Sequence, residues 1–150
     1  MREYMTQMEA ARKGIITPQM KAVAAKEYRT EEEIREWVAK GQVAICANRL
    51  HTCIDPNGVG SMLRTKINVN LGVSRDCKDY EIEMQKVMAA VNMGAEAIMD
   101  LSSHGNTQPF RRKLTSECPA MIGTVPVYDS VIHYQRDLAT LTAKDFIDVI

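Results

Sequence analysis

Apolar and polar positions in the first third of the chain follow the spacing of short helices. Thr17 followed by Pro18 predicts a helix start, because a threonine N-cap and a proline at the first helical position both favour one, and we expect this helix to run to about Lys26. A second start is predicted at Thr30, which has the spacing of a capping box with Glu33. The apolar stripe and the closing glycine of this helix are Ile34, Trp37, Val38 and Gly41.

The pattern changes beyond the first third. Residues 43–47 form an apolar, partly β-branched run that precedes a turn-forming segment, which favours a strand or a buried extended segment. From residue 65, apolar runs typical of strands alternate with helical patterns: strands at 66–71, 97–101 and 121–127, and helices at 80–93 and 111–117. This alternation predicts an α/β fold with parallel strands and right-handed crossovers. We therefore expect a helical N-terminal segment with a short strand over residues 1–64, followed by βα units over residues 65–150.

The C-terminal residues carry the beginning of another helical pattern. Thr142 to Asp145 has the features of a helix start, and the apolar residues from Phe146 to Ile150 follow it without a cap, a glycine or a polar tail. We expect the chain to be truncated inside a helix. The alternative is a short terminal helix that docks on a core.

Composition narrows the class of protein. A chain of 150 residues that is 45% hydrophobic can bury a core, and its nineteen basic and nineteen acidic residues cancel. We therefore expect neither a nucleic-acid partner nor a membrane partner. Residues 1–11 lack the continuous apolar core of a secretory signal, so we expect reduced cysteines and a cytosolic location.

Candidate binding residues lie where the predicted strands end, because loops at the carboxyl ends of parallel strands converge on one rim. Asn70, Met99 with Asp100, and Tyr128 occupy these ends. Asn70 and Met99 are twenty-nine positions apart, and so are Met99 and Tyr128, which predicts three βα units that each place one side chain on the rim. Taken singly, Asn70 is also typical of a turn, Met99 of a core and Tyr128 of a capping aromatic.

Histidines and cysteines give no metal-binding pattern. Cys46 and Cys53 are separated by six residues, Cys77 and Cys118 stand alone, and the three histidines lack paired spacing. We predict no metal ligands in this chain. His104 lies in the polar loop 102–106, where it could contact a phosphate or a sugar or simply be solvated.

Several ordered motifs carry a resemblance to a known family. They are TQM at 6–8, AARKGIITP at 10–18, RTKINVNLG at 64–72, EAIMDLS at 96–102 and IGTVPVY at 122–128. Through them the chain resembles roughly the first third of the phosphomethylpyrimidine synthase family of thiamine biosynthesis.

The resemblance implies a fold, a reaction and a substrate. Family members are (β/α)8 TIM-type barrels, so this chain would be the N-terminal part of an incomplete barrel. They are radical S-adenosylmethionine lyases that use a [4Fe-4S] cluster to convert 5-aminoimidazole ribonucleotide into the thiamine pyrimidine phosphate. The resemblance assigns ribonucleotide contacts to Asn70, Met99 and Tyr128. It also implies a homodimer at full length, and a divalent metal, zinc or iron, whose ligands and those of the cluster lie outside this chain, which alone would be inactive.

One departure from the family pattern keeps other functions open. The family commonly has PANxNH where this chain has CANRLH at 46–51, so Leu50 replaces an asparagine. This change is also compatible with the related 5-hydroxybenzimidazole synthases of anaerobic cobamide biosynthesis, which start from the same ribonucleotide. A third hypothesis is a short natural protein that acts as a non-catalytic binding or assembly module.

Overall fold

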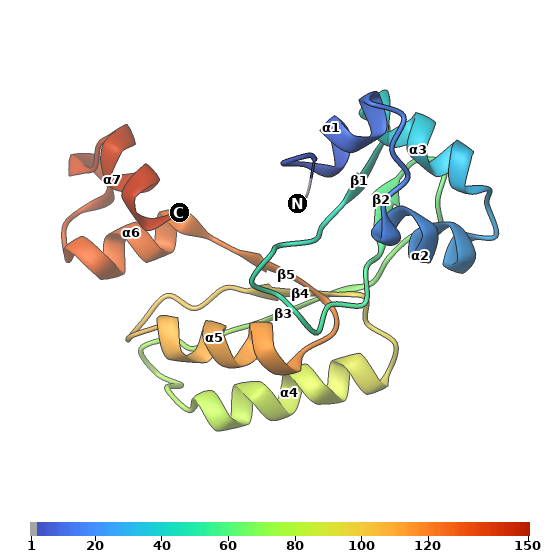
Figure 1. Cartoon of the computed structure of the whole chain (residues 1–150). Helices are drawn as coiled ribbons and strands as arrows, with labels where there is room; N and C mark the ends of the chain where they lie inside the picture. Colours follow the sequence, from blue (N-terminus) through green and yellow to red (C-terminus); the bar gives the residue numbers. More distant parts are fainter. Residues whose placement is uncertain (1–2) are drawn as a thin grey trace. The chain divides into compact units, whose positions relative to one another are not determined.

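A computed structural model describes residues 3–150 of the chain. It divides into two compact units, Met1–Lys66 and Ile67–Ile150, and each is described by itself below (Figure 1). The division into a helical segment over residues 1–64 and barrel units over 65–150 stays a prediction, since compactness alone does not assign a barrel.

The first unit combines short helices with a small antiparallel sheet. Its described elements are α1 (Gln7–Arg12), α2 (Pro18–Glu27), α3 (Glu31–Ala39), β1 (Val43–Ile45) and β2 (Gly58–Gly60). Strand β1 pairs with β2, with Val43 opposite Gly60. The predicted strand at 43–47 is therefore present, whereas the sequence pattern revealed neither α1 nor β2, since each is too short to show a period.

Both predicted helix starts in this unit are confirmed. The Thr17 hydroxyl accepts a hydrogen bond of 3.2 Å from the Met20 N–H, and α2 ends one residue beyond Lys26. Thr30 and Glu33 form the predicted capping box: the Glu33 N–H donates to Thr30 Oγ1 at 3.2 Å, and the Thr30 N–H donates to the Glu33 carboxylate at 2.9 Å. Gly41 adopts a left-handed φ of 73°, as expected after the helix end.

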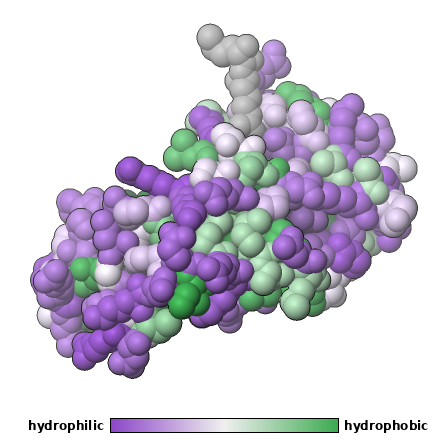
Figure 2. Space-filling view, turned by 90° about the horizontal axis from the view of Figure 1, so that it is seen from below, coloured by the Kyte–Doolittle hydropathy of each residue, from purple (hydrophilic) through white to green (hydrophobic). Residues whose placement is uncertain are grey.

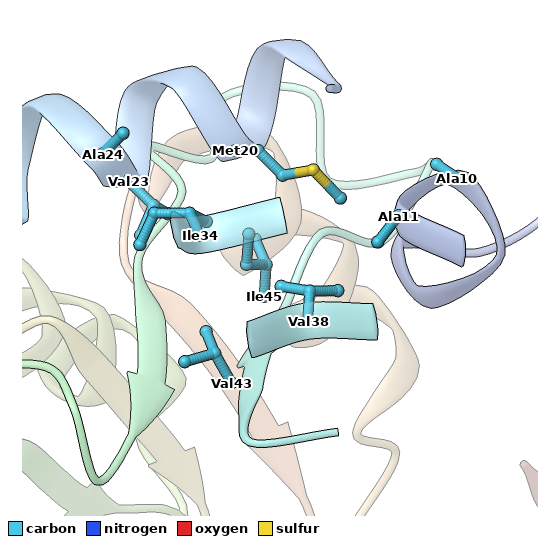
Figure 3. Close-up of a cluster of buried hydrophobic side chains, with 9 residues drawn as sticks. All are labelled: Ala10, Ala11, Met20, Val23, Ala24, Ile34, Val38, Val43 and Ile45. Carbon is cyan, nitrogen blue, oxygen red and sulfur yellow. The ribbon is translucent and has the colours of Figure 1, made fainter. Parts of the chain in front are cut away.

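An apolar cluster and a buried ion pair help to stabilise the first unit. Apolar side chains from its helices and β1 gather into one cluster (Figure 3): Ala10, Ala11, Met20, Val23, Ala24, Ile34, Val38, Val43 and Ile45. At the end of α2, the Glu27 carboxylate, only 4% exposed, pairs with Lys66 Nζ and accepts a 2.8 Å hydrogen bond from the Arg64 N–H. This ion pair joins the last residue of the unit to α2.

The second unit is built on a parallel sheet. Its described elements are β3 (Asn68–Leu71), α4 (Tyr80–Asn92), β4 (Ala97–Asp100), α5 (Gln108–Glu117), β5 (Met121–Thr124), α6 (Pro126–Tyr134), the 3-10 turn η1 (Leu138–Thr140) and α7 (Ala143–Val149). The strand order is β3-β4-β5, with both pairs parallel. The prediction of alternating strands and helices with parallel pairing is confirmed, and the described strands form no closed barrel.

One face of this sheet is covered by helices. Helices α4 and α5 lie together beneath the three strands (Figure 1). Their apolar residues pack with those of the sheet in one cluster: Leu71, Met84, Val87, Ala90, Ile98, Phe110, Leu114, Cys118 and Ala120. Since alternate residues of a strand point to opposite faces, the neighbours of Leu71 and Ile98 along the strands point away from these helices.

Two predicted boundaries were wrong because of prolines. Strand β5 ends at Thr124, not at residue 127, since Pro126 has no N–H for a sheet ladder and instead occupies the first turn of α6. Helix α5 begins at Gln108, before the predicted start at Arg111, with Pro109 in its first turn. Thr142 does cap the last helix, as predicted, with its N–H donating to the Asp145 carboxylate at 2.7 Å.

The surface is mostly polar on the side where α4 and α5 lie. Seen from that side, hydrophilic residues predominate and hydrophobic ones form smaller groups (Figure 2). Ile82, Met88 and Met93 are the large apolar residues that α4 and its C-terminal cap expose. Among residues 3–150, no helix combines the length and the apolar character required to cross a bilayer.

We predict that Glu27→Gln destabilises the first unit in a pH-dependent way. Burial raises the pKa of the Glu27 carboxyl, but the hydrogen bonds from Lys66 and the Arg64 N–H outweigh it, so the pKa is lower than usual. A carboxyl of this kind stabilises the fold above its unfolded pKa of about 4.3, and the contribution is lost as the pH falls through the folded value. At pH 7 the substitution should lower the free energy of unfolding by about 1–3 kcal/mol.

The measurement is denaturant unfolding followed by fluorescence of Trp37, the one tryptophan of the chain, which packs against the core of the first unit. The difference between wild type and variant should shrink below about pH 4. Glu32→Gln, at an exposed position on α3, is the matched control and should change the free energy by less than about 0.5 kcal/mol. Equal effects of the two substitutions at pH 7 would contradict the role of the ion pair.

Candidate functional site

The open face of the parallel sheet carries two of the predicted site residues side by side. The register places Asn70 of β3, Met99 of β4 and Gly123 of β5 in one row across the sheet. Because Leu71 and Ile98 point toward α4 and α5, Asn70 and Met99 point to the opposite face. The Asn68 side-chain amide donates a 2.9 Å hydrogen bond to Asn70 Oδ1, which orients the Asn70 amide on this face.

Gly123 provides the space that the Met99 side chain occupies. A Cβ at position 123 would lie 2.7 Å from Met99 Cε and 2.8 Å from Met99 Sδ, closer than such atoms approach in proteins. The Met99 thioether therefore packs against Gly123 at the β5 end of the row, and a larger residue at position 123 would displace it.

Tyr128 does not lie in this row. The partner of Met99 on β5 is Gly123, five residues before Tyr128. Tyr128 instead lies in the first turn of α6, 42% exposed, with its N–H donating to the Val125 carbonyl at 3.0 Å. The equal spacing of twenty-nine residues thus reflects strand register for Asn70 and Met99 only. Tyr128 follows the carboxyl end of the adjacent strand.

The residue that follows Met99 is a buried aspartate, whose side chain points to the opposite face of the sheet from that of Met99. Asp100 is fully buried, and its Oδ1 accepts hydrogen bonds from the Ser102 N–H at 3.0 Å and the Ser102 hydroxyl at 2.5 Å. The Ser102 hydroxyl also accepts a 3.1 Å hydrogen bond from the Val73 N–H. This bond joins the segments that follow β3 and β4, beyond the ends of the two strands. The other oxygen, Oδ2, accepts a 2.8 Å bond from Arg111 Nε.

Arg111 connects this carboxylate to a second one. Its Nη1 donates to Asp129 Oδ2 at 2.6 Å, while the Thr107 hydroxyl donates to Asp129 Oδ1 at 3.4 Å. Burial lowers the pKa of Arg111, but the hydrogen bonds to Asp129 and Asp100 raise it by more, so the guanidinium is charged. Sequence reasoning placed Arg111 only at a helix start. The available signal was an aspartate closing an apolar strand, which requires a cationic or hydrogen-bonding partner once buried.

A cleft of about 870 Å³ opens beside this network. Residues from the loops after β3 and β4 and from α5, α6 and α7 line it, among them Arg75, His104, Arg111, Asp129 and His133. His104 thus lies where a loop residue was predicted to face a ligand, and its carbonyl accepts a 3.3 Å bond from the Tyr80 hydroxyl. None of Asn70, Met99 and Tyr128 is among the described residues that line this cleft.

Comparison with known proteins identifies the family. A model of the radical SAM ThiC family matches residues 6–150. The chain belongs to this family. It is 55% identical over 148 residues, 99% of its length, to a protein of Alkaliphilus oremlandii named phosphomethylpyrimidine synthase, and 54% identical over 147 residues, 98% of its length, to one of the same name from Clostridioides difficile. The chain spans about a third of the length of these relatives, 34% in both cases.

The part of this ThiC-family chain that the structure describes holds no group of three or more His, Cys, Asp or Glu side chains placed to bind a metal ion. In the loop at 46–51, where Leu50 replaces the asparagine common in the family, Leu50 is 82% exposed and its N–H donates to Asn48 Oδ1 at 2.8 Å. The remaining asparagine of this loop therefore binds the loop backbone.

We predict that Gly123→Ala moves the Met99 side chain at a small cost in stability. The added methyl group comes too close only to the flexible end of Met99, so the melting temperature should fall by no more than about 2–4 °C, which corresponds to about 1 kcal/mol in a chain of this length. The Met99 methyl resonance should shift in a spectrum of 13C-methyl methionine, while that of Met93, which is 90% exposed, should not. An unchanged Met99 resonance would disprove the close packing.

Proposed function

We propose that this chain is part of a phosphomethylpyrimidine synthase that converts 5-aminoimidazole ribonucleotide into 4-amino-5-hydroxymethyl-2-methylpyrimidine phosphate in thiamine biosynthesis. The single observation that carries the proposal is the identity of more than half of the residues to proteins of that name over almost the entire chain. The enzyme class is a radical S-adenosylmethionine lyase, and we expect it to act as a homodimer.

The second unit supports a barrel as the complete fold. Parallel strands with both connecting helices on one face are the repeating units of a (β/α)8 barrel, in which helices form the outer layer and binding residues lie at the carboxyl ends of the strands. In such a barrel, the face that carries Asn70 and Met99 is the inner one. We propose that this chain supplies the first βα units and part of the substrate pocket.

Within that pocket the three predicted residues have distinct roles. The Asn70 amide can pair with a ring edge or a sugar hydroxyl, the Met99 thioether can pack on the flat imidazole, and the Tyr128 phenol can donate a hydrogen bond to phosphate. We assign none of these side chains a role as a general acid or base. Their contribution is to hold the ribonucleotide in one orientation while the cofactor chemistry proceeds.

The described residues do not fit the cofactors of this reaction. Cys46, Cys53, Cys77 and Cys118 lack the close spacing of an iron-sulfur motif, and residues 3–150 contain no metal-binding cluster. We therefore assign no ligand of the [4Fe-4S] cluster, of S-adenosylmethionine or of a divalent metal to residues 3–150. By itself the chain should be inactive.

A second candidate is 5-hydroxybenzimidazole synthase, which acts on the same ribonucleotide and with which the change to Leu50 is compatible. An exposed leucine replaces an amide at this position, and the pocket that contacts the ribonucleotide would otherwise be shared. Incubating the full-length enzyme with the ribonucleotide, S-adenosylmethionine and a reductant, and identifying the product by its mass, distinguishes the two. We expect the thiamine pyrimidine phosphate. Formation of hydroxybenzimidazole would replace the first proposal with the second.

We predict that Asn70→Ala and Tyr128→Phe each weaken ribonucleotide binding to the full-length protein. Each removes one polar partner from a buried ligand, which costs about 1–3 kcal/mol in binding free energy. Isothermal titration calorimetry measures the change. The matched controls are Asn92→Ala, on the exposed end of α4, and Tyr28→Phe, at the exposed end of α2. Unchanged affinity in both site variants would refute the assignment of the pocket.

A further inference from the structure

Arg111 lies between the two chain segments that carry Met99 and Tyr128. Asp100 follows Met99 directly at the end of β4, and Asp129 follows Tyr128 directly in α6. Nε of Arg111 donates to the first carboxylate at 2.8 Å and Nη1 donates to the second at 2.6 Å. One guanidinium therefore connects the residues next to two of the three predicted ligand contacts.

We propose that Arg111 is a positioning residue of the ribonucleotide pocket, which fixes the distance between Met99 on the sheet and Tyr128 on α6. The inference rests on the proposed function, because the pocket residues are those assigned above. Arg111 acts through Asp100 and Asp129 and does not itself contact the substrate.

Helix α6 depends on this connection because the hydrophobic core does not reach it. The apolar cluster of the second unit includes residues of β3, β4, β5, α4 and α5, but none of the described residues of α6. Ser130 is the buried residue of α6, and its hydroxyl donates to the Pro126 carbonyl of the same helix. Asp129, with bonds to Arg111 and Thr107, thus links the helix of Tyr128 to the rest of the unit.

Unlike Asp129 on α6, Arg111 lies on a helix that is anchored in the apolar core. It lies on α5 next to Phe110, and both Phe110 and Leu114 are buried in the apolar cluster. Asp100 is equally fixed, since Ser102 occupies its second oxygen. Because Arg111 is fixed relative to the sheet, its bond to Asp129 restricts the position of α6 relative to the sheet.

The chemistry of the link requires arginine. A planar guanidinium donates in several fixed directions and can bind two carboxylates at once, whereas a lysine ammonium acts as a point charge. The geometry uses Nε and Nη1 for the two carboxylates, while Nη2 is buried without a hydrogen-bond partner among the described residues. Keeping an unpaired donor buried costs free energy, and the two charge-assisted bonds offset that cost.

The test measures the affinity of the full-length protein for 5-aminoimidazole ribonucleotide by calorimetry. Arg111→Met should weaken binding by about tenfold or more, because displaced contacts lose binding energy steeply with distance. Asp129→Ala should do the same while leaving the buried Asp100–Arg111 pair intact, so it remains informative if Arg111→Met fails to fold. Arg112→Met, at the exposed neighbouring position on α5, is the matched control and should leave the affinity unchanged.

A coupling measurement separates positioning from a general structural effect. If Arg111 and Asp129 act through Tyr128, Asp129→Ala should weaken binding by less than about twofold once Tyr128→Phe is present, since interacting residues are not additive. A purely structural defect would lower the melting temperature and give additive losses. Additive losses, or wild-type affinity in a folded Asp129→Ala variant, would overturn the inference. Failure of the wild-type protein to bind the ribonucleotide would instead overturn the proposed function, and the positioning role with it.

Discussion

Strand alternation in the parallel sheet of the second unit determines most of what this chain presents to a ligand. Each strand sends one residue toward α4 and α5 and the next to the other face, so a single shift in register would exchange the two sets. Leu71 and Ile98 are buried with the helices, and this fixes Asn70 and Met99 on the open face. The apolar core and the candidate pocket are consequences of the same pairing.

Polar interactions extend the order of the sheet beyond its apolar core. The core ends with β5, and the chain then turns at Pro126 into a helix that lies outside the apolar cluster. The buried Asp100, its serine partner and Arg111 continue the structure from the strand ends to Asp129. Buried charges are costly unless each is paired, and this requirement makes the arrangement specific. The ion network therefore fixes the positions of the segments at the strand ends, as apolar packing fixes the helices beneath the sheet.

Family membership indicates the reaction, and the structure indicates which side chains could contact the substrate. Membership of the radical SAM ThiC family relates the chain to synthases of the thiamine pyrimidine, and the sheet offers an amide and a thioether on a face that a barrel would enclose. The described residues that line the cleft include Arg111 and Asp129 but none of Asn70, Met99 and Tyr128. Acidic and basic side chains both line this cleft, whereas the row on the sheet carries an amide and a thioether.

The sequence by itself determined the features that depend on neighbouring residues. The caps at Thr17, Thr30 and Thr142 join atoms within three residues of each other, and the alternation of strands and helices follows from local periodicity. Only the tertiary structure decided that Gly123 and not Tyr128 is the partner of Met99, and that Arg111 joins Asp100 to Asp129. The two residues of each of these pairs lie at least eleven positions apart in the chain. Such pairs are selected by packing and by the need to neutralise a buried charge, neither of which leaves a periodic trace in the sequence.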